Sequence, residues 1–346
     1  MPSLTALLEH HWNLEHVVPD ATLQQYPTRS VAAIRSDQGR FVVKVYNDEW
    51  ALGLVNPSIA EIDQRLSIFE YLAGSGFRHA PLHLKTNTGD RFLRMGGTTV
   101  YVLEWVEGAR PPATTETWAE LGRLAACLNA RTDYPHDYAI PVAGAIAELT
   151  EQAGRYPFRS DFLDLVSTLG ILADQPMCLI HGELNPSNSV RSPGGRLIIL
   201  DWDQAGTGPW VLEGGYPLIT TFLSEDLAFD ARSAAAFYGA WARDHDLDAG
   251  RKDIIFTAAL FHALRYLGFG DPFRRWARIQ YAVTHKHSLL AALDAGPTPV
   301  QRNQDVICCS TTSGFASASR ATGRPRPDGS ACRRGIPLPE PGRSNP

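Results

Sequence analysis

No stretch of the 346-residue sequence approaches the roughly 18 consecutive apolar residues that cross a bilayer as a helix. The start of the chain, MPSLTALLEHHWNLEH, lacks the basic residues and the apolar run of a secretory signal. Cysteine is also scarce, and the five cysteines follow no regular spacing, which argues against a zinc site. These absences lead us to expect a cytoplasmic protein that has no membrane among its partners.

The sequence also has no excess of positive charge. Its net charge is −5, which disfavours nucleic acid as the main partner because phosphate backbones bind basic surfaces. Hydrophobic residues make up 44% of the chain and charged residues 20%, as in ordinary globular proteins of one or two domains. The composition leaves the oligomeric state open.

The end of the chain differs from the rest. Residues 297–346 contain seven arginines, three acidic residues and no lysine, with little apolar content after Ile307. Such a segment buries too little apolar surface to offset the entropy of ordering it, so we expect a disordered tail. A basic arm that binds a partner is the alternative interpretation.

Residues 1–107 are predicted to form a β-rich lobe. β-Branched and aromatic residues on both sides of an Asp-Gln-Gly turn indicate a hairpin over residues 30–46. Apolar residues recur at helical spacing over residues 58–73, which predicts one main helix. Further strands are expected over residues 91–95 and 98–106.

The second lobe, residues 108–296, is predicted to be larger and mostly helical, so that the whole fold is α+β. A capping-box pattern at Thr117 and Glu120 indicates the start of its first helix. Two short apolar runs, 177–180 and 197–200, interrupt the helical pattern. Apolar periodicity predicts the other helices near residues 143–155, 161–173, 230–244, 251–268 and 274–293.

The residues that carry chemistry gather around these two apolar runs. The loop HGELNPSN, residues 181–188, follows the first run and places Glu183 and Asn188 five residues apart. Asp201 arrives where the second run ends. An acid, an amide and a second acid at strand ends suit a proton acceptor and a divalent cation, because Mg²⁺ prefers hard oxygen ligands.

This pattern resembles the catalytic loop and the metal-binding loop of kinases. The His-Gly-acid form, with LDWDQAGTGP after it, resembles the aminoglycoside phosphotransferase and choline kinase family, which includes type II homoserine kinases. FVVKVY resembles the strand that supplies the nucleotide lysine, here Lys44. VYVLEWVEG resembles the hinge strand, whose backbone groups near Glu104 and Val106 would bond the adenine. The resemblance covers residues 20–295.

The resemblance implies a bilobal protein-kinase-like fold that uses ATP and Mg²⁺. Lys44 would hold the nucleotide phosphates, and Asn188 and Asp201 would bind Mg²⁺. Glu183 would orient a substrate hydroxyl and accept its proton. His181 would have a structural role, holding the loop through its ring nitrogens.

The chain departs from the family at four places. Glu213 stands where many relatives have Asp. Glu183 stands where the family usually has Asp, so its longer side chain suits a loop that sits slightly back. The phosphate-covering turn, LQQYPTRS, has no glycine. Arg65 stands where relatives commonly have the Glu that pairs with the nucleotide lysine. We expect Glu61, one turn earlier on the same flank of the helix, to take this role, in preference to Asp63 on the other flank.

The predicted function is therefore a small-molecule kinase whose acceptor hydroxyl stays open among aminoglycosides, choline-like amines, amino-acid alcohols and sugars. The short interval between Asp201 and Gly208 leaves no activation segment, which disfavours a protein acceptor. Four acids of the second lobe either receive a cationic amino compound or lie on solvated helix faces: Glu213, Glu225, Asp226 and Asp230.

Three of these departures, at Glu183, at Arg65 and in the glycine-free turn, also motivate an alternative, a nucleotide-binding pseudokinase without turnover. A metal-dependent hydrolase that uses Glu183 and Asp201 is a weaker candidate, because it leaves Lys44 and the hinge unexplained. The role of Asp203, two residues after Asp201, stays open between a secondary metal ligand and a supporting residue.

Overall fold

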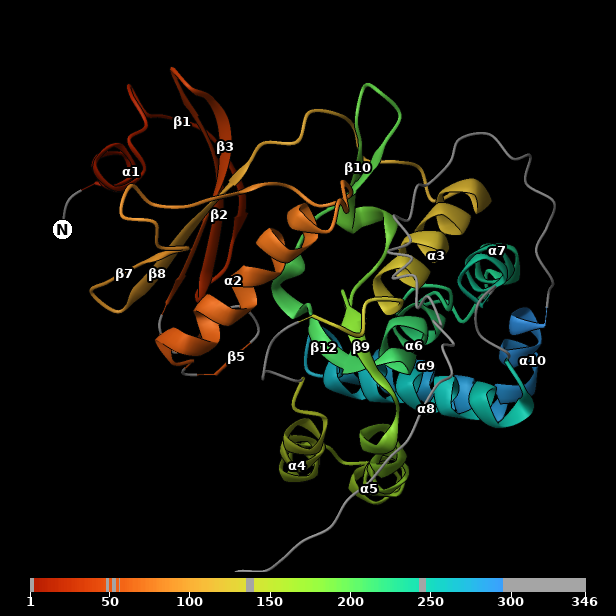
Figure 1. Ribbon diagram of the computed structural model, residues 1–346. Helices are drawn as coiled ribbons and strands as arrows, with labels where there is room; N and C mark the ends of the chain where they lie inside the picture. The colour runs from red at the N-terminus through yellow and green to blue at the C-terminus, as the bar shows by residue number, and fades with distance from the viewer. Residues whose placement is uncertain are drawn as a thin grey trace, which may run out of the picture. The chain divides into compact units, whose positions relative to one another are not determined.

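The computed structural model describes residues 3–47, 50–51, 54–55, 57–134, 140–242 and 247–294, all of which belong to one compact unit. The predicted tail over residues 297–346 lies outside the described residues. A β-rich lobe is followed along the chain by a larger helical lobe, as Figure 1 shows, so the α+β class is confirmed. No helix among the described residues is long and apolar enough to cross a membrane.

An antiparallel sheet forms the centre of the N-terminal lobe, in the strand order β1-β2-β3-β8-β6, with β7 also paired to β8. The first helix, α1 (Leu4–Trp12), packs on one face of this sheet. The strands are β1 (Val18–Gln25), β2 (Arg29–Ser36), β3 (Gly39–Asn47), β6 (His83–Leu84), β7 (Leu93–Met95) and β8 (Thr98–Glu104). A separate two-residue ladder joins β4 (Trp50–Ala51) to β5 (Leu54–Val55).

The central strand β3 divides its side chains between two environments, because successive residues of a strand point to opposite faces. Val43 packs with Leu8 and Trp12 of α1 in one hydrophobic cluster. Tyr46 belongs to the other cluster, which extends into the helical lobe. Lys44 shares the face of Tyr46, so the strand buries its lysine on the side away from α1.

The main helix of the first lobe, α2 (Ile59–Gly74), lies close to the predicted range. Its apolar positions, including Ile62 and Leu66, are buried as their spacing predicts. A capping box starts the helix: the Ser58 hydroxyl accepts a hydrogen bond from the Glu61 amide, and the Glu61 carboxylate accepts one from the Ser58 amide.

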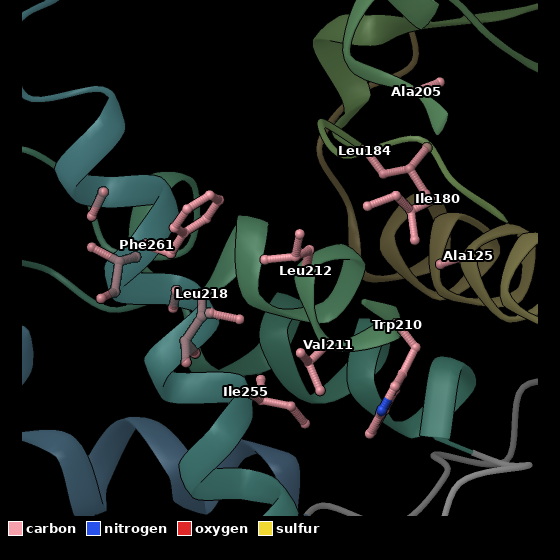
Figure 2. Close-up of a cluster of buried hydrophobic side chains, with 14 of the residues drawn as sticks. Ala125, Ile180, Leu184, Ala205, Trp210, Val211, Leu212, Leu218, Ile255 and Phe261 are labelled. Carbon is pink, nitrogen blue, oxygen red and sulfur yellow. The ribbon is translucent and has the colours of Figure 1, made fainter. Parts of the chain in front are cut away.

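The second lobe is built on helices that approach closely through glycines. A Cβ atom on Gly122 would lie 2.3 Å from the Phe237 carbonyl oxygen, and one on Gly215 would lie 2.5 Å from the Ala258 Cβ. Figure 2 shows part of the apolar cluster, in which Leu212 and Leu218 of α6 lie near Ile255 and Phe261 of α8. The helices are α3 (Thr115–Asn129), α4 (Val142–Gln152), α5 (Arg159–Ser167), α6 (Trp210–Thr220), α7 (Ala231–Trp241), α8 (Ala249–Arg265), α9 (Pro272–Thr284) and α10 (Lys286–Leu290).

The start of α3 differs from the sequence-based expectation. Thr114 caps the helix by accepting a hydrogen bond from the Thr117 amide at 3.4 Å. Thr117 is therefore buried inside the first turn and is not the cap. Two threonines three residues apart offer equivalent cap chemistry, and the helix takes the earlier one, so it begins one turn before the expected start.

Two short strand pairs interrupt the helices and hold the loops between them. Strand β9 (Met177–Ile180) pairs with β12 (Gly206–Pro209), and β10 (Ser189–Arg191) pairs with β11 (Leu197–Ile199). The loop 181–188 therefore leaves β9 and enters β10, and the segment 200–205 leaves β11 and enters β12. Each pair fixes one end of both loops, which brings the loops side by side.

The close contact at Gly215 predicts that Gly215→Ala lowers stability by roughly 1–3 kcal/mol, because the added methyl group meets the backbone of α8 and forces a shift. Gly144→Ala in α4 is the matched control. A Cβ there lies at an ordinary 3.6 Å from its nearest neighbour, so higher helix propensity should raise stability by up to about 1 kcal/mol. Equal thermal unfolding temperatures for the two variants would contradict this packing.

Candidate active site

A buried carboxylate on helix α6 holds the start of the loop 181–188. The backbone amides of His181 and Gly182 both donate to Oε2 of Glu213, which lies in the first turn of α6. Burial lowers the pKa of His181 to about 4, so its ring is neutral and its Nε2 donates to the Leu200 carbonyl at 2.9 Å. Glu213 and His181 thus fix the loop, in keeping with the structural role expected for His181.

Glu183 lies half-buried at the centre of this loop. Its carboxylate accepts a hydrogen bond from the phenol of Tyr266, the residue that follows α8. Burial, together with the negative charges of Asp201 and Asp203, raises the pKa of Glu183 to about 8. The carbonyl of Glu183 accepts a bond from the Asn188 side chain at 3.1 Å, so the loop is closed on itself.

Asn188 and Asp201 meet across the β10–β11 hairpin. The Leu200 amide donates to the Asn188 carbonyl at 2.7 Å, which places Asn188 beside the residue that precedes Asp201. Since Nδ2 of Asn188 donates to Glu183, its Oδ1 is left without a hydrogen bond to the described part of the chain. Asp201 has φ 57° and ψ 62°, a left-handed conformation that few non-glycine residues adopt and that recurs at functional sites.

Lys44 contacts both acids of the loop that follows β11. Its Nζ lies 2.6 Å from Oδ1 of Asp201 and 2.9 Å from Oδ1 of Asp203. The lysine side chain is only 7% exposed. Burial alone would lower the pKa of Lys44, but the two aspartates outweigh it and raise the pKa, so the amine stays charged. The structure therefore joins the strand lysine to the acids of the second lobe.

The expected partner of Lys44 on α2 is not brought to it. Glu61 accepts a bond from the Ser58 amide at 2.7 Å and so remains at the start of the helix. Arg65, one turn later, is buried, and its guanidinium donates to the backbone carbonyl of Asp203. The acids that contact Lys44 come from the second lobe, and the capping box keeps Glu61 at the start of α2.

The two predicted adenine contacts differ in what they offer a ligand. The Glu104 amide donates to the Leu82 carbonyl at 2.8 Å, and the Glu104 carboxylate accepts from the Leu82 amide at 2.9 Å. The backbone of Val106 makes no hydrogen bond to the described part of the chain. Val106 is thus the better placed of the two to bond a base, and both contacts stay predictions.

A cavity of about 500 Å³ lies beside the loop and is lined in part by Gly182, Gln204 and Tyr266. Because Tyr266 also contacts Glu183, this cavity opens next to the candidate proton acceptor. The apolar residues that line the cavity include Ile140, Leu149, Phe261 and Phe269. The charged side chains on its walls have both signs: Glu61, Arg65, Glu148 and Arg265.

The acids that the sequence offered for a cationic acceptor do not line this cavity. Glu213 supports the loop, and Asp230 caps α7 by accepting from the Ser233 amide at 3.1 Å. Glu225 and Asp226 are exposed in the preceding turn. Tyr266 and Glu148 were not identified from sequence, because no local motif shows that the residue after α8 and a residue within α4 line the same cavity.

Among the described residues, no group of three His, Cys, Asp or Glu side chains is arranged to hold a metal ion. The pair of Asn188 Oδ1 and the Asp201 carboxylate fits Mg²⁺ of the kind that takes its remaining ligands from water and phosphate oxygens. The Asp201 side chain is 21% exposed, so one side of it remains open to such a ligand.

Comparison with known proteins gives a consistent result. A sequence model of the phosphotransferase enzyme family matches residues 28–247, more than half of the chain. No curated protein sequence matches. A solved aminoglycoside phosphotransferase from Alicyclobacillus acidocaldarius is 17% identical with a TM-score of 0.54, and the match covers 85% of this chain and 96% of that one.

Two further solved structures share the architecture. A spectinomycin phosphotransferase, solved with ADP and spectinomycin, is 13% identical with a TM-score of 0.54, covering 84% of this chain and 97% of that one. A choline kinase from Cryptosporidium parvum is 12% identical with a TM-score of 0.53, covering 81% and 93%. At these identities the likeness establishes the fold, and the expected protein-kinase-like architecture is confirmed.

The buried support of the loop predicts a pH-dependent stability. Burial raises the pKa of Glu213 from 4.5 to about 7, so between these values the folded protein binds more protons than the unfolded chain. The free energy of unfolding should therefore fall as pH rises from 4.5 to 7, by roughly 3 kcal/mol for this group.

Glu213→Gln should remove this slope, because an amide mimics the protonated acid and still accepts from the loop amides. Thermal unfolding at pH 5 and pH 8 measures how the stability changes with pH. Glu151→Gln, on the exposed side of α4, is the control. If the stability of the wild type and of Glu213→Gln changed equally with pH, Glu213 would not titrate in this range.

Proposed function

The chain belongs to the phosphotransferase enzyme family, and on that premise we propose that it transfers the γ-phosphate of ATP to a hydroxyl group of a small molecule, with Mg²⁺ as cofactor. The observation that carries the proposal is the contact of Lys44 with Asp201 at 2.6 Å, beside a loop that also holds Glu183 and Asn188. A nucleotide lysine, a metal carboxylate and amide, and a proton acceptor are the parts that phosphoryl transfer requires.

On the nucleotide side, Lys44 supplies a fixed positive charge for the phosphates, and the hinge near Glu104 and Val106 supplies backbone groups for the adenine. Asn188 and Asp201 would hold Mg²⁺ through Oδ1 and a carboxylate oxygen. When bound, this ion neutralises negative charge on the phosphate oxygens. Few side chains need to react, because positioning and charge neutralisation provide most of the acceleration.

On the acceptor side, Glu183 orients the substrate hydroxyl and takes its proton. The hydrogen bond from Tyr266 fixes the longer glutamate side chain, which offsets the extra methylene relative to aspartate. A raised pKa, about 8 for the ligand-free protein, makes the ionised carboxylate a stronger proton acceptor. Activity should therefore increase with pH through the neutral range.

The cavity of about 500 Å³ beside Glu183 is the proposed acceptor pocket. Its size suits an amino alcohol, an amino acid, a sugar or an aminoglycoside-like compound, and its walls carry both acids and arginines. The second candidate function is a nucleotide-binding regulator without turnover. It is favoured by Arg65, which occupies the position where relatives commonly carry the lysine-binding acid.

Asp201→Ala tests the assignment of the metal carboxylate. We expect loss of more than about 100-fold in kcat with an unchanged fold, because no other carboxylate takes its place at the phosphates. Mg-dependent ADP formation, measured with a panel of amines, aminoglycosides, amino acids and sugars, provides the readout. Asp164→Ala, on the exposed face of α5, is the matched control. Full activity in folded Asp201→Ala protein would rule out this assignment.

Glu183 is tested by a pair of substitutions. Glu183→Asp should retain activity, since it keeps the carboxylate and restores the arm length that is usual in the family. Glu183→Gln should lose most activity, because the amide cannot accept a proton at neutral pH. The ratio of kcat values for the two variants is the measurement. Equal losses would mean that loop geometry is the requirement, and wild-type activity in Glu183→Gln would show that Glu183 is not the base.

A further inference from the structure

Asp203 comes from a loop of the second lobe, yet its carboxylate is bonded entirely by the sheet of the first lobe. Oδ1 accepts from Lys44 at 2.9 Å and from the Tyr101 phenol at 2.8 Å. Oδ2 accepts from the Arg29 guanidinium at 3.1 Å and from the Tyr46 phenol. The side chain of Asp203 is only 5% exposed, so this is a buried charge with four donors.

The four donors share one face of the sheet because of its register. Lys44 on β3 pairs with Tyr101 on β8, and Arg29 on β2 pairs with Tyr46 on β3. Lys44 and Tyr46 are two residues apart on the same strand, so their side chains point the same way. The sheet therefore presents a compact polar patch of two cations and two phenols, and Asp203 is the anion that fills it.

The carboxylate of Asp203 has no capacity left for a metal ion. An ionised carboxylate offers about four lone-pair positions, and four donors occupy them here. Asp201 differs: its side chain is 21% exposed, Lys44 is its near partner, and Arg29 lies at 3.8 Å. Donors of the first lobe therefore occupy every acceptor position of Asp203, whereas one side of Asp201 stays open.

Helix α2 supports this arrangement without supplying the anion. Arg65 donates to the backbone carbonyl of Asp203, which holds the loop against the helix. Glu61 is engaged by Ser58 at the start of the helix, and the other acid of that turn, Asp63, pairs with Arg91. Arg65 therefore stands where relatives commonly have the acid that pairs with the lysine. It holds the loop that carries Asp203, and Asp203 contacts Lys44.

We propose that Asp203 is the positioning residue that holds Lys44 for the nucleotide phosphates, in place of an acid on α2, and that it is not a metal ligand. The inference rests on the proposed function for the role of Lys44. Asp203 keeps Lys44 in place when Asp201 binds the metal ion. One acid therefore holds the lysine, and the other holds the metal.

The test is ATP binding in the absence of metal, measured by calorimetry in excess EDTA. Asp203→Asn should weaken metal-free ATP binding by about tenfold or more, because Lys44 loses its fixed partner. Asp201→Asn should weaken metal-free ATP binding less than Asp203→Asn does, because the Asp203 carboxylate still holds Lys44 in that variant. Asp20→Asn, which removes a partner of Arg35 and Arg40 on the same sheet, is the matched control and should bind like the wild type.

Two outcomes overturn the inference. If Asp203→Asn binds metal-free ATP like the wild type and shifts only the Mg²⁺ concentration needed for turnover, Asp203 is a metal ligand. If Glu61→Gln weakens metal-free ATP binding tenfold, the anchor of Lys44 lies on α2. Should Asp203→Asn not fold, Tyr101→Phe carries the same test, since it removes one donor and no charge; its metal-free affinity should fall about two- to threefold, and an unchanged value counts against the inference.

A second measurement does not depend on nucleotide binding. Lys44→Met, Asp203→Asn and the double variant form a cycle in thermal unfolding temperature. If Asp203 holds Lys44, the double variant loses less than the sum of the single losses. Additive losses overturn the inference. If the wild type binds no ATP with or without Mg²⁺ while the cycle is non-additive, the proposed function fails and the pairing stands.

Discussion

A buried lysine, a buried aspartate and a partly exposed aspartate, which meet between a β-sheet and a loop, form the interaction on which the rest of the site depends. Removing such charges from water costs several kcal/mol for each ion, so each must be paired and hydrogen-bonded. Lys44 contacts both acids, and Arg29 and two phenols complete the bonding of Asp203. The loop must therefore reach the sheet, and the left-handed backbone of Asp201 and the bond from Arg65 allow it to do so.

The same constraint explains how the sheet is used. Strand β3 packs Val43 against α1 and turns Lys44 to the opposite face, where the second lobe supplies the anions. The hairpin β10–β11 then sets the spacing between Asn188 and Asp201, and Glu213 fixes the amides that precede Glu183. Two short strand pairs and the buried carboxylate of Glu213 therefore position the polar residues of the site, and the packed helices of the second lobe support them.

The sequence predicted those features of the fold and the site that a short stretch of the chain determines. The hairpin, the main helix, and the order of Glu183, Asn188 and Asp201 follow from local spacing and turn chemistry. The bonds of Asp203 to Arg29 and Tyr101 span 174 and 102 residues, and they depend on strand register that no local pattern reveals. The position of Glu61 had a visible signal, because Ser58 followed three residues later by Glu61 is a capping-box pattern.

The central claim is that this arrangement transfers phosphate to a small hydroxyl compound. The most direct measurement is phosphorus NMR of the purified protein incubated with MgATP and mixtures of amino alcohols, amino acids, sugars and aminoglycosides. The account predicts that the γ-phosphate signal declines while ADP and a phosphomonoester signal grow in equal amounts for at least one mixture. Stable ATP in every mixture, or ADP formed only with inorganic phosphate, would contradict it.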